Sequence, residues 1–91
     1  MNGRQSARGT ILRVEANGSG PNSVEVLIRL DQKDNESFFL FFPQQNEREE
    51  FFKNLSTAFK AMWDENTVEI DFDCYHGDQR VKSIKIAPFK K

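Results

Sequence analysis

A run of four phenylalanines and a leucine, FFLFFP, begins at Phe38 and ends at a proline. In a β-strand, successive side chains point to opposite faces. Phe38, Leu40 and Phe42 therefore share one face, and Phe39 and Phe41 share the other. A strand of this composition is apolar on both faces, so each face needs a cover. One set is expected to fill the interior of a folded domain, and the other set needs the helix, a neighbouring subunit or a ligand.

Patterns on either side of this run predict three strands, a helix and two further strands. Alternation of apolar and polar residues, with turn-forming residues between the segments, predicts strands over 10–15, 24–30, 37–42, 67–74 and 80–86. In the last of these, Val81 and Ile84 are three residues apart whereas Ile84 and Ile86 are two apart. This change of spacing predicts a β-bulge near Lys82 and Ser83.

The predicted helix lies between the third and fourth strands. Pro43 ends the third strand, because proline has no N–H to donate to the sheet. Asn46 is the predicted N-cap, and Glu49 follows three residues later at the capping-box position. Apolar residues then recur at spacings of three and four, which predicts a helix of about four turns whose apolar stripe packs on the core. The stripe comprises Phe51, Phe52, Leu55, Ala58, Phe59, Met62 and Trp63.

This order of elements, β-β-β-α-β-β, is that of a small five-stranded barrel of the oligonucleotide/oligosaccharide-binding (OB) kind, in which the helix plugs one open end. An open antiparallel sheet with a helix packed on one face has the same order and is the alternative. We expect a single domain over residues 1–91, with a core of about 9–87 and loose ends at 1–8 and 88–91. No apolar stretch approaches the roughly 20 residues that span a bilayer.

The charges of the chain are unevenly distributed. The formal net charge is −1, but residues 31–73 carry eleven acids and four bases, and the chain from Cys74 onward carries five bases and one acid. A general attraction to nucleic acid is therefore not expected. Arg80, Lys82 and Lys85 on the last strand are candidates for a local nucleic-acid contact. Alternatively, these bases balance the acids of the neighbouring antiparallel strand.

Phe39 and Phe41 are the candidate residues for a ligand site or a subunit interface. Stacking of bases or sugars on exposed rings is one use of such a barrel. A subunit interface or a cover from within the chain is favoured, because few basic residues lie beside these rings in the sequence. Leu27 lies on the same side of the neighbouring strand and extends the apolar patch, which is typical of a protein contact. We therefore predict a homo-oligomer.

Catalytic and metal-binding patterns are sparse. The segment DFDCYHGD holds carboxylates, a thiol and an imidazole, which together can bind a divalent ion. On a regular strand, however, Cys74 points to the core whereas Asp71 and Asp73 point away, so we predict no metal. With His76 as the sole histidine and no nucleophile-elbow motif, we predict neither an enzyme nor a cofactor.

A single cysteine permits no internal disulfide, and the amino-terminal residues lack the apolar core of a signal peptide. The expected location is therefore the cytoplasm, or outside the cell if a leader has been removed.

The segment FFKNLSTAFKAMWDENTVEIDFD, followed by RVKSIKI, resembles the closing segment of the ring-forming B subunits of bacterial AB-type toxins, in their pertussis-like and subtilase-like branches. The similarity covers residues 51–86, and GTILRV matches the first strand of those subunits. It implies an OB-fold and a homo-oligomeric ring, with five subunits as the expected number. It also implies helices at the centre of the ring and glycan sites on its outer face.

Toxin B subunits are secreted and usually carry a disulfide, so a stand-alone bacterial relative of unknown ligand is the better interpretation of a chain with one cysteine. The sequence thus predicts a non-enzymatic binding module that forms a homo-oligomer and binds a glycan or a receptor. A protein that binds single-stranded nucleic acid and a structural or adaptor subunit are the alternatives.

Overall fold

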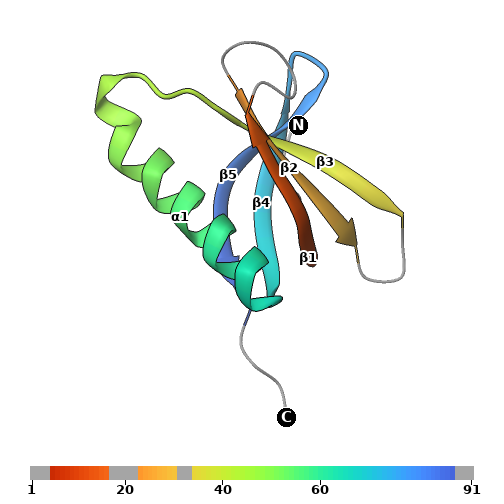
Figure 1. Ribbon diagram of the computed structural model, residues 1–91. Helices are drawn as coiled ribbons and strands as arrows, with labels where there is room; N and C mark the ends of the chain where they lie inside the picture. The colour runs from red at the N-terminus through yellow and green to blue at the C-terminus, as the bar shows by residue number, and fades with distance from the viewer. Residues whose placement is uncertain (1–4, 17–22, 31–33, 88–91) are drawn as a thin grey trace.

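The computed structural model describes residues 5–16, 23–30 and 34–87, so residues 1–4 of the loose end predicted at 1–8, and the one predicted at 88–91, lie outside the described residues. The described chain forms five strands and one α-helix, which a 3₁₀ turn precedes (Figure 1). In chain order these are β1 (Gln5–Ala16), β2 (Ser23–Leu30), β3 (Asn35–Phe41), η1 (Gln45–Glu47), α1 (Arg48–Asp64), β4 (Thr67–Tyr75) and β5 (Asp78–Ile86).

The five strands close into a barrel in the order β1-β2-β3-β5-β4, and β4 pairs back to β1. All neighbours are antiparallel except β3 and β5, which are parallel and meet at Phe39 and Arg80. This closed barrel, with its helix between β3 and β4, confirms the predicted small OB-like barrel. The alternative of an open sheet is wrong, because β1 pairs with both β2 and β4 and leaves no open edge there.

Strand β1 is longer than predicted and pairs with two neighbouring strands, β2 and β4. It begins at Gln5 rather than Thr10, and residues 5–8, expected as part of a loose end, are paired with β4. At Gly9 the strand passes from one neighbour to the other, since Gly9 is the register partner of both Val68 and Leu30. A Cβ atom on Gly9 would lie 2.3 Å from the carbonyl oxygen of Arg29, so only glycine fits this close approach.

Strands β1 and β5 each carry a bulge. In β5 the register moves from the pair Asp71–Ser83 to the pair Phe72–Val81, which leaves Lys82 as the extra residue and confirms the predicted bulge. In β1 the corresponding extra residue is Leu12. The two bulges increase the local bending of strands that must curve around a small barrel.

The barrel interior covers one face of the phenylalanine run. Phe38 and Leu40 are buried, and the Phe38 ring packs edge-to-face on Phe72 with 4.8 Å between ring centroids. Phe42, predicted to share their face, lies just beyond the end of β3 and packs against Phe51 at the barrel rim, 5.8 Å between centroids. The remaining core residues alternate along the strands as predicted, among them Val24, Val26, Ile28, Val68, Ile70, Phe72, Val81 and Ile84.

The start of the helix differs from the prediction. The N-cap of α1 is Glu47 rather than Asn46, and the capping box belongs to the preceding turn η1, where Gln44 is the N-cap and Glu47, rather than Glu49, is its partner. The backbone N–H of Gln44 donates to the Glu47 carboxylate at 3.4 Å. The capping signal is therefore used two residues earlier, by a 3₁₀ turn that the spacing of apolar residues does not reveal.

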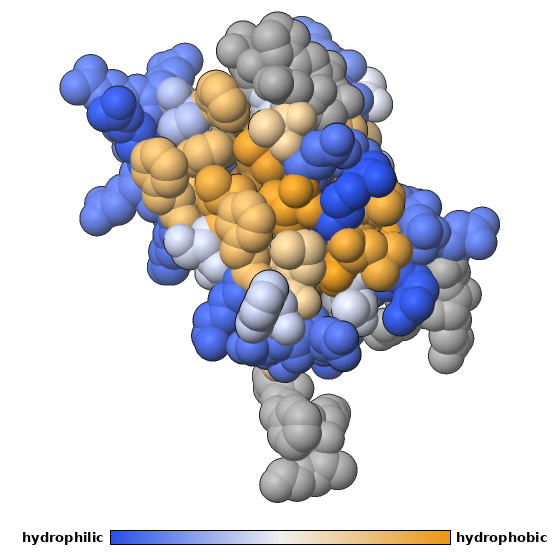
Figure 2. Space-filling view, viewed as in Figure 1, coloured by the Kyte–Doolittle hydropathy of each residue, from blue (hydrophilic) through white to orange (hydrophobic). Residues whose placement is uncertain are grey.

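Only one side of α1 packs on the barrel, where it contacts β1 and β5. That side buries Phe51, Asn54, Ala58 and Ala61. The prediction that the whole apolar stripe is core is wrong for three residues, because Phe52 is 58% exposed, Phe59 47% and Trp63 84%. Figure 2 shows apolar side chains gathered on this face of the molecule, over α1 and the strands beside it.

Candidate ligand-binding face

A row of side chains crosses four strands on the outside of the barrel. Glu25 of β2 is the register partner of Phe39 on β3, Phe39 is the partner of Arg80 on β5, and Arg80 is the partner of Asp73 on β4. Register partners on neighbouring strands point to the same side of a sheet. The row therefore places an aromatic ring between a carboxylate and a guanidinium on the surface opposite to the buried Phe38.

The outward-facing rings form a cluster. Phe39 and Phe41 lie edge to face with 6.4 Å between centroids, and Phe41 lies edge to face on Tyr75 at 5.5 Å. The guanidinium carbon of Arg80 lies 4.4 Å from the centroid of the Tyr75 ring, which is a cation–π contact. Tyr75 and Arg80 of the same chain thus partly cover the second face of the phenylalanine run, while Phe39 and Phe41 stay half-buried and accessible. We call Phe39, Phe41, Tyr75 and Arg80 the aromatic face.

Arg80 is held by two hydrogen bonds to the carboxylate of Asp73. Its Nε donates to Asp73 Oδ1 at 3.0 Å and its Nη2 donates to Oδ2 at 2.9 Å. This bidentate pairing raises the pKa of Arg80 above its usual value, although partial burial of the group acts in the opposite direction. Arg80 therefore stays charged at any working pH, and its charge is matched by a carboxylate in a fixed orientation.

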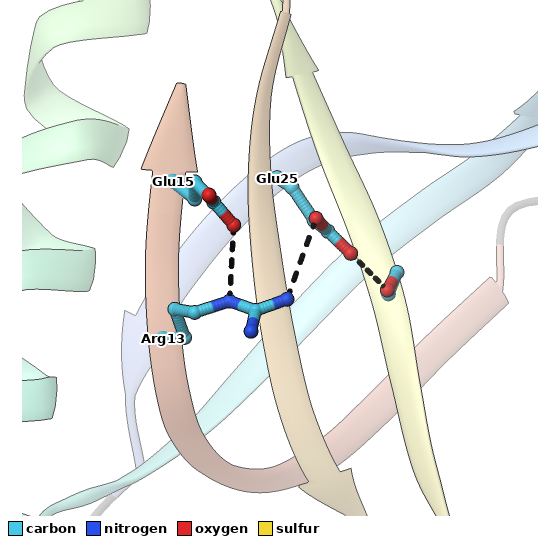
Figure 3. A network of polar contacts seen from close by, with 4 residues as sticks. Arg13, Glu15 and Glu25 are labelled. Carbon is cyan, nitrogen blue, oxygen red and sulfur yellow. Dashed lines mark hydrogen bonds and ion pairs between the residues drawn. The ribbon is translucent and has the colours of Figure 1, made fainter. Parts of the chain in front are cut away.

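A second polar network fixes the β2 side of this face (Figure 3). The guanidinium of Arg13 lies between two carboxylates, with its Nε 3.2 Å from Glu15 and its Nη2 3.8 Å from Glu25. The hydroxyl of Ser37 on β3 donates to the other oxygen of Glu25 at 2.5 Å. Glu25 thus has partners on both sides, from β1 and from β3.

Gln79 of β5 bonds to the β3 side of the second network. Its side-chain amide donates to the carbonyl oxygen of Ser37 at 3.0 Å and to the carboxylate of Glu36 at 3.2 Å. The polar atoms around the rings are therefore supplied by every strand of the barrel and are largely oriented by one another.

A hollow of about 170 Å³ adjoins the aromatic face where β3 and β5 meet the start of α1. Its walls carry both acids and bases as well as two rings, and they consist of Leu40, Phe41, Glu47, Glu50, Phe51, Asn54, Arg80, Val81 and Lys82. The hollow is smaller than the roughly 300–1,000 Å³ of a drug-sized site. It therefore suits one small ring or group at the end of a larger ligand.

Asn54 is a residue of this hollow that the sequence patterns missed. It is 5% exposed on the buried side of α1, and its Oδ1 accepts a hydrogen bond from the backbone N–H of Ile84 at 3.2 Å. The only available signal is an asparagine within the apolar repeat of the helix, at a position that faces the barrel.

The predicted site residues are only partly brought together. Phe39, Phe41 and Arg80 belong to the aromatic face, and Lys82 lines the hollow. Leu27 on β2 is half-buried and is the register partner of Ser37 on β3. Lys85 is the register partner of Glu69, away from the rings. The register therefore sets Arg80 opposite Asp73, with which it forms an ion pair, and Lys85 opposite Glu69. This placement of bases opposite acids agrees with the alternative interpretation of these charges at two of the three bases.

The segment DFDCYHGD does not form a cluster of ligands. The prediction that Cys74 points to the core is wrong, because the thiol is exposed near the end of β4, beyond the last described pair of that strand with β1 at Phe72. Among residues 5–16, 23–30 and 34–87, no three His, Cys, Asp or Glu side chains are placed to hold a metal ion. Within the same ranges, no helix has the length and apolar character required to cross a membrane.

Comparison with known proteins assigns the chain to no family. No protein-family model matches the chain, and no curated protein is similar enough to count as a relative.

Proposed function

We propose that the chain is a non-enzymatic binding module that holds a glycan on the aromatic face. The observation that carries this proposal is the cluster of half-exposed rings from β3 and β4 beside Arg80, flanked by oriented carboxylate, amide and guanidinium groups. A sugar combines an apolar surface with polar groups in the same way, since one side of its ring is apolar and its hydroxyls donate and accept hydrogen bonds.

The polar groups suit an uncharged ligand with hydroxyls. Glu36 and Asp73 can accept hydrogen bonds from hydroxyl donors, and the amide of Gln79 can donate. Because these groups already have partners within the protein, little side-chain entropy is lost when a ligand orders them further. The adjoining hollow then receives one residue of the chain of sugars.

The charges of this face support the binding of nucleic acid less well than the binding of a glycan. A phosphate backbone requires cations that are free to exchange their counterions. Arg80 is already paired with Asp73, and Arg13 lies between Glu15 and Glu25. The face therefore carries acids beside each of its arginines, which weakens the attraction to a polyanion.

The first experiment is a screen of the folded protein against immobilised glycans, followed by titration in solution with the glycans that bind. Tyr75→Ala and Phe41→Ala should each weaken binding at least tenfold, because each removes a ring of the cluster. Phe52→Ala is the matched control, since it removes an exposed ring from α1 instead.

Two results would count against the proposal. One is the absence of any glycan signal from correctly folded protein, and the other is equal weakening by Tyr75→Ala and Phe52→Ala. Binding of single-stranded DNA that falls steeply with salt, and whose salt dependence is reduced by Lys82→Ala with Lys85→Ala, would favour the nucleic-acid alternative instead.

A further inference from the structure

The hollow beside the aromatic face is lined by an amide that the fold uses only on one side. Asn54 is 5% exposed, and its Oδ1 accepts a hydrogen bond from the N–H of Ile84. Within the part of the chain that the structure describes, its Nδ2 has no hydrogen-bond partner, and no fully buried side-chain nitrogen or oxygen lacks one. Nδ2 is therefore accessible, and the space that Asn54 lines is the hollow. A nearly buried amide thus offers its N–H groups to an occupant of the hollow.

The orientation of the Asn54 amide is fixed by its bond to β5. If the amide turned over, its NH2 group would face the N–H of Ile84, and two donors would meet. The donor in the hollow is therefore held in place before a ligand arrives, so little side-chain entropy is lost on binding. This position selects an occupant with an acceptor oxygen.

The hollow also has apolar walls. Leu40, Phe51 and Val81 line it, and all three belong to the buried core. A polar group that is buried against such walls without a hydrogen-bond partner costs free energy, whereas an apolar group gains from the contact. The occupant should therefore bring apolar atoms as well as its acceptor oxygen.

Charged residues of both signs complete the lining. Arg80 and Lys82 line the hollow from β5, and the exposed carboxylates of Glu47 and Glu50 line it from the start of the helical segment. Carboxylates repel an anion, and the two cations repel a cation, so the lining favours a neutral occupant. Glu47 already accepts the backbone N–H of Gln44, which leaves Glu50 as the acceptor for an N–H of the occupant.

We infer that the hollow holds the acetamido group of an N-acetylated amino sugar, an inference that rests on the proposed function of the aromatic face. The carbonyl oxygen of the group accepts from Asn54 Nδ2, its N–H donates to Glu50, and its methyl group lies on the apolar walls. Phe41 and Arg80 belong both to the aromatic face and to the lining of the hollow. A sugar ring on the aromatic face therefore has a substituent within reach of the hollow.

Other substituents at the same position of a sugar satisfy the lining less well. A hydroxyl can accept from Asn54 but brings no apolar atoms to the walls. An ammonium group has no acceptor for Asn54 and is repelled by Lys82, and a carboxylate is repelled by Glu50. The acetamido group alone among these is neutral and combines an acceptor, a donor and a methyl group.

The test is an NMR titration of the isotope-labelled chain with matched sugars. One series has the glucose configuration and the other that of galactose, and within each series the substituent beside the anomeric carbon is hydroxyl, amino or acetamido. We expect the acetamido sugar of a series to bind about tenfold or more tightly than the other two. The side-chain NH2 signals of Asn54 should shift with the acetamido sugar. If only larger glycans bind, the same comparison uses each of these glycans and its de-N-acetylated form.

Asn54→Asp removes the donor from the hollow and keeps an acceptor for the N–H of Ile84. It should abolish the preference for the acetamido sugar over the hydroxyl sugar, and the loss of its NH2 signals identifies them in the parent. Asn35→Asp is the matched control, since it makes the same change at an exposed position at the start of β3. Tyr75→Ala should instead weaken all sugars of a series alike, because it removes a ring of the aromatic face and leaves the hollow unchanged.

The outcomes separate this inference from the function on which it rests. Equal binding of the acetamido and hydroxyl sugars, or binding glycans that carry no acetamido group, would overturn the inference while the glycan function stands. Tighter binding of the amino sugar would assign the hollow to an ammonium group instead. A preference that persists in Asn54→Asp would place the acetamido group elsewhere. If no sugar and no immobilised glycan binds, the proposed function itself fails.

Discussion

Replacing Asn54 with alanine tests how α1 is attached to the barrel. β5 pairs with β3 only at Arg80, so beyond that residue the edge of β5 that faces α1 has no strand partner. The Ile84 N–H on this edge instead donates to Asn54 Oδ1. In Asn54→Ala this buried N–H loses its acceptor, which costs about 1–3 kcal/mol, while alanine recovers up to about 0.7 kcal/mol through its higher helix propensity.

Thr57→Ala is the matched control for this substitution. Thr57 lies three residues later on α1, and its exposed hydroxyl donates to the carbonyl oxygen of Lys53 one turn earlier. Its replacement gains a similar helix propensity but leaves no buried donor without a partner. The difference in free energy of unfolding between the two variants should therefore be about 1–3 kcal/mol.

Urea denaturation followed by circular dichroism measures this difference, and amide hydrogen exchange of Ile84 locates it. Exchange at Ile84 should accelerate in Asn54→Ala by more than the global loss of stability explains, because the amide becomes accessible by local opening. Equal stabilities for the two variants, or an Ile84 amide that exchanges in step with the rest of β5, would refute the assignment of Asn54 as the link between helix and barrel.

Two further substitutions test the packing. Phe51→Ala should cost about 3–5 kcal/mol of unfolding free energy, because Phe51 is buried and packs against the rings of Phe42 and Phe52. Phe52→Ala should cost less than about 1 kcal/mol, because Phe52 is mostly exposed. Thermal melts at low concentration measure both, and equal losses would mean that the two sides of α1 are wrongly assigned. Gly9→Ala should cost about 2–3 kcal/mol or more, because its Cβ would overlap the carbonyl oxygen of Arg29; a variant as stable as the parent in urea would contradict this close approach.

Local patterns were sufficient to predict the order of elements and most of the inward-facing residues. Alternation identifies Val24, Val26 and Ile28 as one face of β2, and the altered spacing in β5 identifies the bulge at Lys82. These predictions succeed because the period of a strand and the insertion of one residue are both visible within a few positions.

The features that local patterns missed depend on contacts between distant segments. An apolar arc on a helix shows which residues avoid water but not where the barrel ends on that arc, so Phe59 and Ala58 are indistinguishable by spacing. The need for glycine at position 9 comes from the carbonyl oxygen of Arg29 on another strand. The role of Asn54 comes from the N–H of Ile84, which is likewise on another element. The Arg80–Asp73 pair likewise follows from the register of β4 on β5, which the bulge shifts by one residue.

The two apolar surfaces of the chain have different consequences for binding. On the aromatic face, Phe39 and Phe41 are partly covered by Tyr75 and Arg80, so that surface needs no protein partner to remove it from water. On α1, Trp63 is 84% exposed and nothing in the described chain covers it. The proposed ligand site therefore lies on β3 and β5 and does not include the exposed rings of α1.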